Sequence, residues 1–179
     1  MSDFDLDLQS IQEARRLVCA AREAQQQFMR ATQAEVDRIC AAMAEAGAAA
    51  AERLGKMACE ETGYGVPEHK RLKNLLATQT LWNSIKDVPS VGVIRRDPQR
   101  QLVDIAWPMG VVAALTPSTN PTSTVFFKTL IAVKARNAIV IAPHPAAAKC
   151  SLEAARVMAE AGQKAGMPPG LVACMSNIH

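Results

Sequence analysis

The sequence lacks any apolar run that approaches the ~20 residues needed to cross a bilayer. It also lacks the basic opening of a secretory signal, because Asp3, Asp5 and Asp7 stand there instead. The chain also has no large excess of one charge, because its net charge is +3 and its basic residues are dispersed along the sequence. We therefore expect a cytoplasmic protein without a nucleic-acid or membrane partner.

Paired cysteines are missing too. The five cysteines are odd in number and widely separated, with no C-x-x-C pair and no histidine at metal-ligand spacing: Cys19, Cys40, Cys59, Cys150 and Cys174. We expect reduced thiols and no metal site. Only Cys150 is a candidate nucleophile, because a helix N-terminus near it would lower its pKa, although no base stands beside it.

A dinucleotide-binding glycine motif is absent, since no glycine lies between Gly110 and Gly162. That absence counts against an ordinary Rossmann enzyme with a G-x-G-x-x-G turn. What is present is 179 residues with 49% hydrophobic content, enough for one folded unit with a sizeable core.

The first half of the sequence predicts helices. Thr32 and Glu35 form a capping box, and Gly63 is well placed to end a helix before Pro67 opens the next. The pattern predicts helices over 7–28, from 32 toward 47, from the alanine run at 46–51 to about 61, and over 67–85. Their expected inner faces carry Ile11, Ala14, Val18, Ala21 and Phe28 in the first helix and Leu72, Leu75, Leu76 and Trp82 in the last. Residues 1–90 form the N-terminal helical segment.

Residues 91–108 predict a short antiparallel strand pair, 91–95 and 101–107, joined by a turn. Residues 109–179 predict the first βαβαβ half of a doubly wound parallel sheet. Its strands are the apolar runs 111–115, 138–142 and 171–175, and its helices follow the turn 116–121 and residue 146. The fold class is therefore α/β, and the continuous run 111–115 is typical of a buried parallel strand.

In such sheets ligands bind beyond the carboxyl ends of the strands, which here means the turn Thr116–Asn120. Asn120 precedes a proline at the first helical position, so its side chain is a candidate N-cap; its amide is also a candidate donor to an oxyanion. His144 follows the next strand and is either a surface residue or a cofactor contact. The chain ends directly after its last strand, which would leave an exposed sheet edge, and we expect it to be a fragment.

Two segments carry a family resemblance. They are P-S-T-N-P-T-S at 117–123 and P-H-P at 143–145, supported by E-T-G-Y-G at 61–65. They resemble the CoA-acylating aldehyde dehydrogenases, including the aldehyde dehydrogenase half of bifunctional alcohol/aldehyde dehydrogenases. The resemblance covers nearly the whole chain.

The resemblance implies oxidation of a short aldehyde to acyl-CoA with NAD and coenzyme A, in a homo-oligomer whose contacts include the 91–108 strand pair. Asn120 would face the oxyanion. The residues near the cofactors would be Leu115, Thr116, Pro117, Ser118, Thr119, Asn120, His144 and Pro145. The family's nucleophilic cysteine lies beyond the position that matches His179, so the chain alone would be inactive. The alternative is a non-catalytic nucleotide-binding or assembly module derived from that family.

Overall fold

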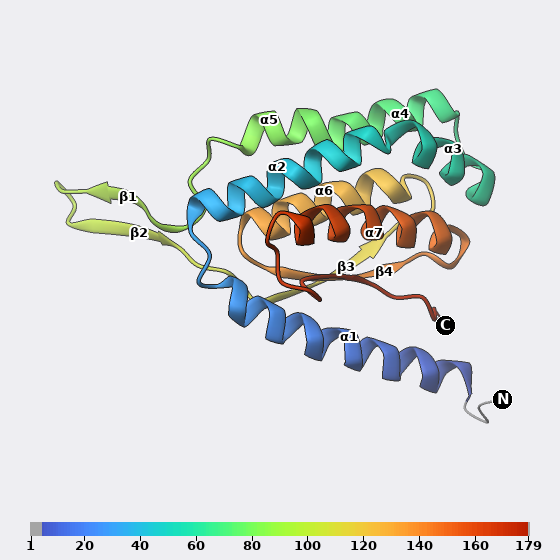
Figure 1. Ribbon diagram of the computed structural model, residues 1–179, viewed down its shortest axis with the longest axis horizontal. Coiled ribbons are helices and arrows are strands. Elements are labelled where there is room, and N and C mark those ends of the chain that lie inside the picture. The colour runs from blue at the N-terminus through green and yellow to red at the C-terminus, as the bar shows by residue number, and fades with distance from the viewer. Residues whose placement is uncertain (1–4, 179) are drawn as a thin grey trace.

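The computed structural model describes residues 5–178, so Asp3 and His179 lie outside the described part (Figure 1). It contains helices, an antiparallel strand pair and a parallel sheet. In chain order the elements are α1 (Leu6–Phe28), α2 (Gln33–Ala49), α3 (Ala51–Thr62), α4 (Pro67–Leu75), the π-helical turn η1 (Leu76–Thr80), α5 (Leu81–Ile85), β1 (Gly92–Asp97), β2 (Leu102–Ala106), β3 (Val111–Thr116), α6 (Pro121–Lys134), β4 (Ala138–Pro143), the 3-10 turn η2 (Pro145–Ala147), α7 (Ala148–Lys164) and β5 (Val172–Cys174).

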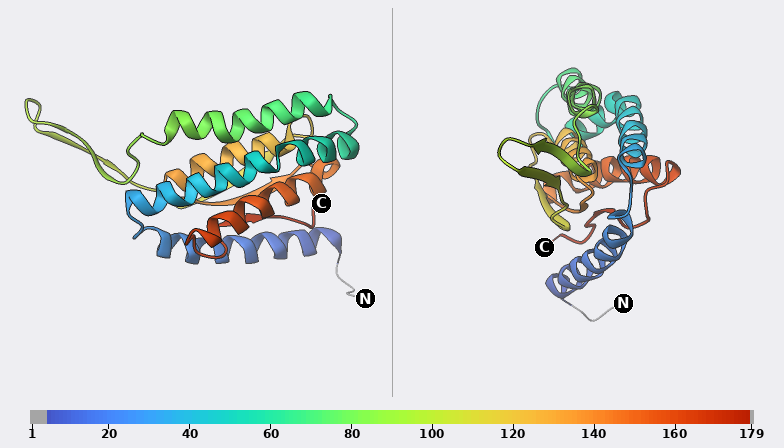
Figure 2. Two further views of the ribbon diagram at one scale, coloured as in Figure 1. Left: turned by 45° about the horizontal axis from the view of Figure 1, so that its top comes forward. Right: turned by 90° about the vertical axis from the view of Figure 1, so that its left-hand side faces the viewer.

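The sheet has the order β3-β4-β5 with both pairings parallel, which confirms the predicted βαβαβ unit. α1 crosses one face of the sheet, and α6 and α7 cover the other (Figure 2). α2 and the α4–α5 run form a further layer over α6 and α7. No helix in the described range is long and apolar enough to span a membrane.

One hydrophobic core joins these layers. Its largest fully buried side chains include Ile39 of α2, Phe126 and Leu130 of α6, Ile141 of β4 and Met158 of α7. α2 approaches its neighbours closely at Gly47, where a Cβ would lie 2.7 Å from Thr78 Cγ2 and 3.4 Å from Met158 Sδ. A larger side chain at that position would force the layers apart.

The predicted helix ends are confirmed at two positions. The Thr32 hydroxyl accepts from the Glu35 N–H and the Glu35 carboxylate accepts from the Thr32 N–H, which is a complete capping box. Gly63 has φ 69° and ends α3 in the left-handed conformation.

The predicted inner faces of two helices are partly wrong. Ile11 and Val18 of α1 are 46% and 44% exposed, and Leu72 and Leu76 are 51% and 60% exposed. Polar side chains take the inward positions instead: Ser10, Glu13 and Gln25 in α1, and Lys70, Asn74 and Thr78 in the α4–η1 run. Four of the six bond to backbone groups of distant segments, which need hydrogen-bond partners: Glu13, Gln25, Lys70 and Asn74.

β3 also differs from its prediction as a buried strand. Leu115 is 75% exposed and alternate residues of β3 are open, whereas β4 is almost entirely buried. The reason is position, because β3 is an outer strand of the described sheet and β4 is the central one.

The β1–β2 pair is antiparallel, as predicted, and projects away from the body of the molecule (Figures 1 and 2). Arg136 holds its base, with Nη1 donating to the Met29 carbonyl at 2.7 Å and Nη2 to the Ala106 carbonyl at 3.2 Å. The strands themselves expose apolar side chains: Val93, Ile94, Leu102, Val103 and Ile105.

Candidate functional site

The carboxyl ends of β3 and β4 lie side by side. Thr116 pairs with Pro143 in the parallel register, and the His144 N–H donates to the Thr116 carbonyl at 3.1 Å. The fold therefore brings the predicted residues 115–120 next to His144 and Pro145, although about 25 residues separate them in the sequence.

Three residues of α4 hold the turn after β3, and we call them the α4 clamp: Lys70, Lys73 and Asn74. Lys70 Nζ donates to the Thr119 carbonyl at 2.9 Å, and Lys73 Nζ donates to Asn120 Oδ1 at 2.9 Å. The Thr122 hydroxyl donates to Asn74 Oδ1 at 2.8 Å, while Asn74 Nδ2 donates to the Ala51 carbonyl. The sequence analysis missed all three, although two lysines and an asparagine at i, i+3 and i+4 share one helix face.

Asn120 occupies the N-cap position of α6, but its side chain does not cap the helix. Its backbone carbonyl accepts from the Thr124 N–H at 3.2 Å and the Thr124 hydroxyl at 2.6 Å, and its Oδ1 accepts from Lys73. The side-chain N-cap prediction is therefore wrong, because the clamp uses the oxygen that would cap. Within residues 5–178, neither its backbone N–H nor its Nδ2 group has an acceptor.

A groove of about 280 Å³ lies beside Asn120. It runs between the α4–η1 segment and the first turns of α6, and its lining is partly apolar: Lys73, Leu76, Ala77, Asn120, Ser123, Thr124 and Phe127. The groove is large enough for a small organic molecule, and Asn120 is one of its lining residues.

His144 is exposed at the end of β4. Its Nδ1 accepts from the Ala146 N–H at 3.1 Å, so a neutral imidazole carries its proton on Nε2. Pro145 then begins η2. The histidine is thus a fixed, outward-facing donor at the carboxyl edge of the sheet.

The N-terminus of α7 is already occupied by a carboxylate. Glu61 Oε1 accepts from the Lys149 N–H at 2.8 Å, and Oε2 accepts from the Cys150 N–H at 2.7 Å. A helix N-terminus favours negative charge, and here the chain itself supplies that charge from the end of α3.

Cys150 has no access to solvent, and its pKa is raised to about 12 by burial and by the neighbouring Glu61 carboxylate. The expectation that the helix N-terminus would lower this pKa is wrong, because the thiol is buried and Glu61 places a negative charge at that N-terminus. Burial likewise raises the pKa of Cys40 and Cys174 to about 12. No group of histidine, cysteine and carboxylate side chains in the described chain could hold a metal ion.

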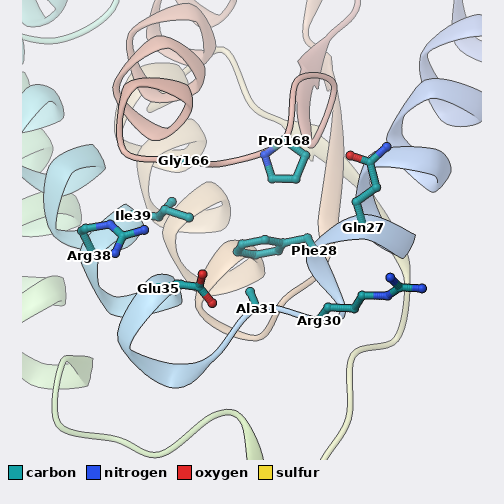
Figure 3. Close-up of a pocket in the computed structure, with 9 residues that line it drawn as sticks. All are labelled: Gln27, Phe28, Arg30, Ala31, Glu35, Arg38, Ile39, Gly166 and Pro168. Atoms are coloured by element: carbon teal, nitrogen blue, oxygen red, sulfur yellow. The ribbon is translucent and has the colours of Figure 1, made fainter.

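A second hollow of about 210 Å³ lies at the opposite end of the sheet (Figure 3). It is bounded by the end of α1, the start of α2 and the Gly166–Pro168 turn, and two of its ionic side chains already have partners. Glu35 belongs to the capping box, and Arg38 Nε donates to the Ala165 carbonyl at 3.2 Å. It faces the amino ends of the strands, away from the edge where parallel sheets bind ligands.

The family model for the aldehyde dehydrogenase family matches residues 6–177. The chain belongs to the aldehyde dehydrogenase family. This confirms the resemblance read from the 117–123 and 143–145 segments, and the fold follows that of acylating members.

Three similar proteins represent the acylating branch. The acetylating aldehyde dehydrogenase of Geobacillus thermoglucosidasius is 55% identical with a TM-score of 0.96, over 98% of this chain and 39% of that one. The bifunctional aldehyde-alcohol dehydrogenase AdhE of Escherichia coli K12 is 39% identical over 91% of this chain and 18% of that protein. Rhodopseudomonas palustris propionaldehyde dehydrogenase, with bound CoA and an acylated cysteine, is 28% identical with a TM-score of 0.75, over 92% of this chain and 37% of that one. The chain thus spans well under half of each of these relatives.

Proposed function

We propose that this chain contributes one wall of the active site of an NAD- and CoA-dependent acylating aldehyde dehydrogenase that converts a short aldehyde to its acyl-CoA. The observation that carries the proposal is Asn120, which lines a groove at the carboxyl end of β3 and whose backbone N–H and Nδ2 groups have no acceptor within the described chain. Membership of the family and the acylating relatives support it.

The residues at this edge fit a nucleotide cofactor. Leu115 offers an exposed apolar surface, and Thr116 to Asn120 form a turn with polar groups beside it. His144 and Pro145 lie at the neighbouring strand end, where the adenosine part of NAD or coenzyme A would contact them. When bound, NAD supplies a hydride acceptor and coenzyme A supplies the thiol that takes the acyl group. The N-terminus of α7 would not hold a phosphate, because Glu61 occupies it.

Asn120 would stabilise the reaction electrostatically. When a thiolate adds to an aldehyde, negative charge develops on the carbonyl oxygen, and the Nδ2 and backbone N–H groups of Asn120 would donate to that oxygen. The thiolate would come from residues outside this chain, because the family resemblance places the nucleophilic cysteine beyond residue 179; within the chain, Cys40, Cys150 and Cys174 also have raised pKa values.

The remaining parts of the proposal concern organisation. We infer a cytoplasmic homo-oligomer in which the β1–β2 pair contacts a neighbouring subunit, supported by its projecting position and exposed apolar side chains. We keep 1–90, 91–108 and 109–179 as the functional division of the chain.

The test compares the 179-residue chain with the longer protein expected to contain it. We expect no aldehyde-dependent NADH formation from the chain alone, and CoA-dependent NADH formation from the longer protein. Asn120→Ala should lower kcat of the longer protein by roughly 10²–10³-fold, the usual effect of losing one oxyanion donor. The matched control is Asn83→Ala, an exposed asparagine on α5. A longer protein without CoA-dependent activity would contradict the proposal.

The raised thiol pKa values of Cys40, Cys150 and Cys174 favour one alternative, a non-catalytic nucleotide-binding module. It predicts that the 179-residue chain itself binds NAD in a calorimetric titration and that no version of the protein oxidises aldehydes.

A further inference from the structure

The residues of the α4 clamp contact the turn after β3 and the first turn of α6. Lys70 contacts the Thr119 carbonyl, Lys73 contacts the Asn120 side chain, and Asn74 contacts the Thr122 hydroxyl. The clamp therefore acts on the residue that the proposed function places at the reacting oxygen. Its two lysines fix different parts of Asn120.

Lys73 determines which way round the Asn120 carboxamide lies. An ammonium group can only donate hydrogen bonds, so the atom 2.9 Å from Lys73 Nζ has to be the amide oxygen. The Nδ2 group then takes the other branch of the carboxamide, where it has no acceptor within residues 5–178. The charge of Lys73 thus selects an arrangement that leaves the donor end free.

Lys70 determines the direction of the Asn120 backbone N–H. Its side chain is 5% exposed and its ammonium donates to the Thr119 carbonyl. Within the described chain every peptide bond is trans, so the N–H of Asn120 points away from the carbonyl that Lys70 holds. Both donors of Asn120 are therefore set from the α4 side.

We propose that Lys73 is a positioning residue for the reaction: it holds the Asn120 carboxamide so that Nδ2, and not Oδ1, faces the reacting oxygen. The inference rests on the proposed function, and it adds a residue outside the turn itself. Lys73 acts through Asn120, to whose Oδ1 it donates. Its positive charge, more than its length, is what the role requires.

The activity should therefore fall stepwise as the charge at position 73 changes from positive to neutral to negative. Lys73→Arg keeps a donor, so kcat should stay within about twofold of the wild type. Lys73→Met removes the preference for one orientation, and we expect a loss of about 3- to 10-fold. Lys73→Glu presents an acceptor, which favours the inverted carboxamide and turns Oδ1 toward the developing charge; we expect roughly a 100-fold loss, close to losing the donor.

The experiment measures kcat and KM for a short aldehyde in the longer protein, for these variants alone and combined with Asn120→Ala. We expect the losses to fall on kcat, with KM changed less than about threefold, and to vanish in the Asn120→Ala background. The matched control is Lys56→Glu, because Lys56 is an exposed lysine of α3 that pairs with Glu52 of its own helix. Equal losses for Lys73→Met and Lys73→Glu, or losses that persist without Asn120, would overturn the proposal.

A second measurement needs no activity. In the 179-residue chain, nitrogen-15 NMR of the asparagine side chains should show the Asn120 amide signals moved by Lys73→Met, moved further by Lys73→Glu, and unmoved by Lys56→Glu. Unchanged signals in every variant would refute the positioning role whatever the kinetics show. The expected NMR result together with an inactive longer protein would refute the proposed function and leave the carboxamide orientation standing.

Discussion

The carboxyl ends of β3 and β4 are followed by the same kinds of element but are contacted by side chains of opposite charge. Each strand runs into a turn and then a helix, and an N-terminal helix contacts each turn. Lysines of α4 contact the turn after β3, whereas the Glu61 carboxylate contacts the turn after β4. Glu61 uses up the free N–H groups of α7, but at α6 the donors of Asn120 remain available. A helix N-terminus after a parallel strand is thus a ligand site only where the rest of the chain leaves it open.

The end of β5 follows the pattern of β4. Glu13 of α1 accepts from the Ser176 N–H and hydroxyl and from the Asn177 N–H. Two of the three strand ends are therefore closed by internal carboxylates, and one is surrounded by lysines. The predictions below open or alter one end at a time.

The largest effect is expected from Asn74→Ala at the β3 end. Asn74 is fully buried, and its loss leaves the Ala51 carbonyl and the Thr122 hydroxyl without their partner. We expect the free energy of unfolding to fall by about 3 kcal/mol, since each buried unsatisfied group costs ~1–3 kcal/mol. Urea denaturation measures the change, with exposed Asn83→Ala as control. A loss no larger than that of the control would show that α4 does not hold this end.

Glu61→Ala should have the next largest effect, at the β4 end. It removes the acceptor of two N–H groups at the start of α7, and we expect the free energy of unfolding to fall by about 2 kcal/mol. Because it empties an anion position, formate or acetate should restore part of the stability in the variant and none in the wild type. Glu60→Ala, an exposed neighbour, is the control. Absence of anion rescue would contradict the view that Glu61 fills the position of an anion.

Glu13→Gln alters the β5 end, and its effect is clearest when stability is measured as a function of pH. Burial would raise the pKa of Glu13, but hydrogen bonds from Ser176 and Asn177, aided by Arg16, outweigh it and lower the pKa below its ordinary 4.5. A carboxylate whose pKa is lower in the folded chain than in the unfolded chain stabilises the fold at any pH above its unfolded-chain pKa. That stabilisation is lost as the pH falls through the folded-chain pKa. The free energy of unfolding of the wild type should fall below about pH 4.5, and that of Glu13→Gln should fall less over the same range. At neutral pH the variant should have a free energy of unfolding about 1 kcal/mol lower than that of the wild type. Melting temperatures between pH 3 and pH 7, with Glu23→Gln as control, decide this, and parallel curves would contradict it.

The smallest effect is a null result at Cys150. Since its pKa is raised to about 12 and its side chain is buried, iodoacetamide at pH 7.5 should leave Cys150 unlabelled while it labels exposed Cys19. Peptide mass spectrometry measures both sites. Fast labelling of Cys150 would mean that the β4 end is open after all.

Sequence patterns were sufficient where the signal is local or strictly periodic. The capping box at Thr32, the left-handed Gly63 and the continuous apolar run of β4 each need only neighbouring residues, and all three were predicted. The turn after β3 and the position of His144 were also predicted, because strand ends meet at one edge of a parallel sheet.

Features that depend on distant partners could not be read in this way. Lys70 and Asn74 are charged or polar residues on a helix, and burial of both depends on a turn about 50 residues further along. The side-chain cap of Asn120 failed for the same reason, since Lys73 competes for its oxygen. The apolar spacing predicts that Leu72 and Leu76 face the core. Lys70 is buried instead, because the Thr119 carbonyl in the turn after β3 accepts a hydrogen bond from it.

The bond between Glu13 and Ser176 joins two residues 163 positions apart. α1 packs on β3, β4 and β5, all of which follow it by more than 80 residues. During synthesis α1 therefore has no strand to pack on until β3 emerges, roughly 4–17 s later at ~5–20 residues per second, and its contact with β5 forms later still. The bond between Glu13 and Ser176 can therefore form only after all three strands have left the ribosome.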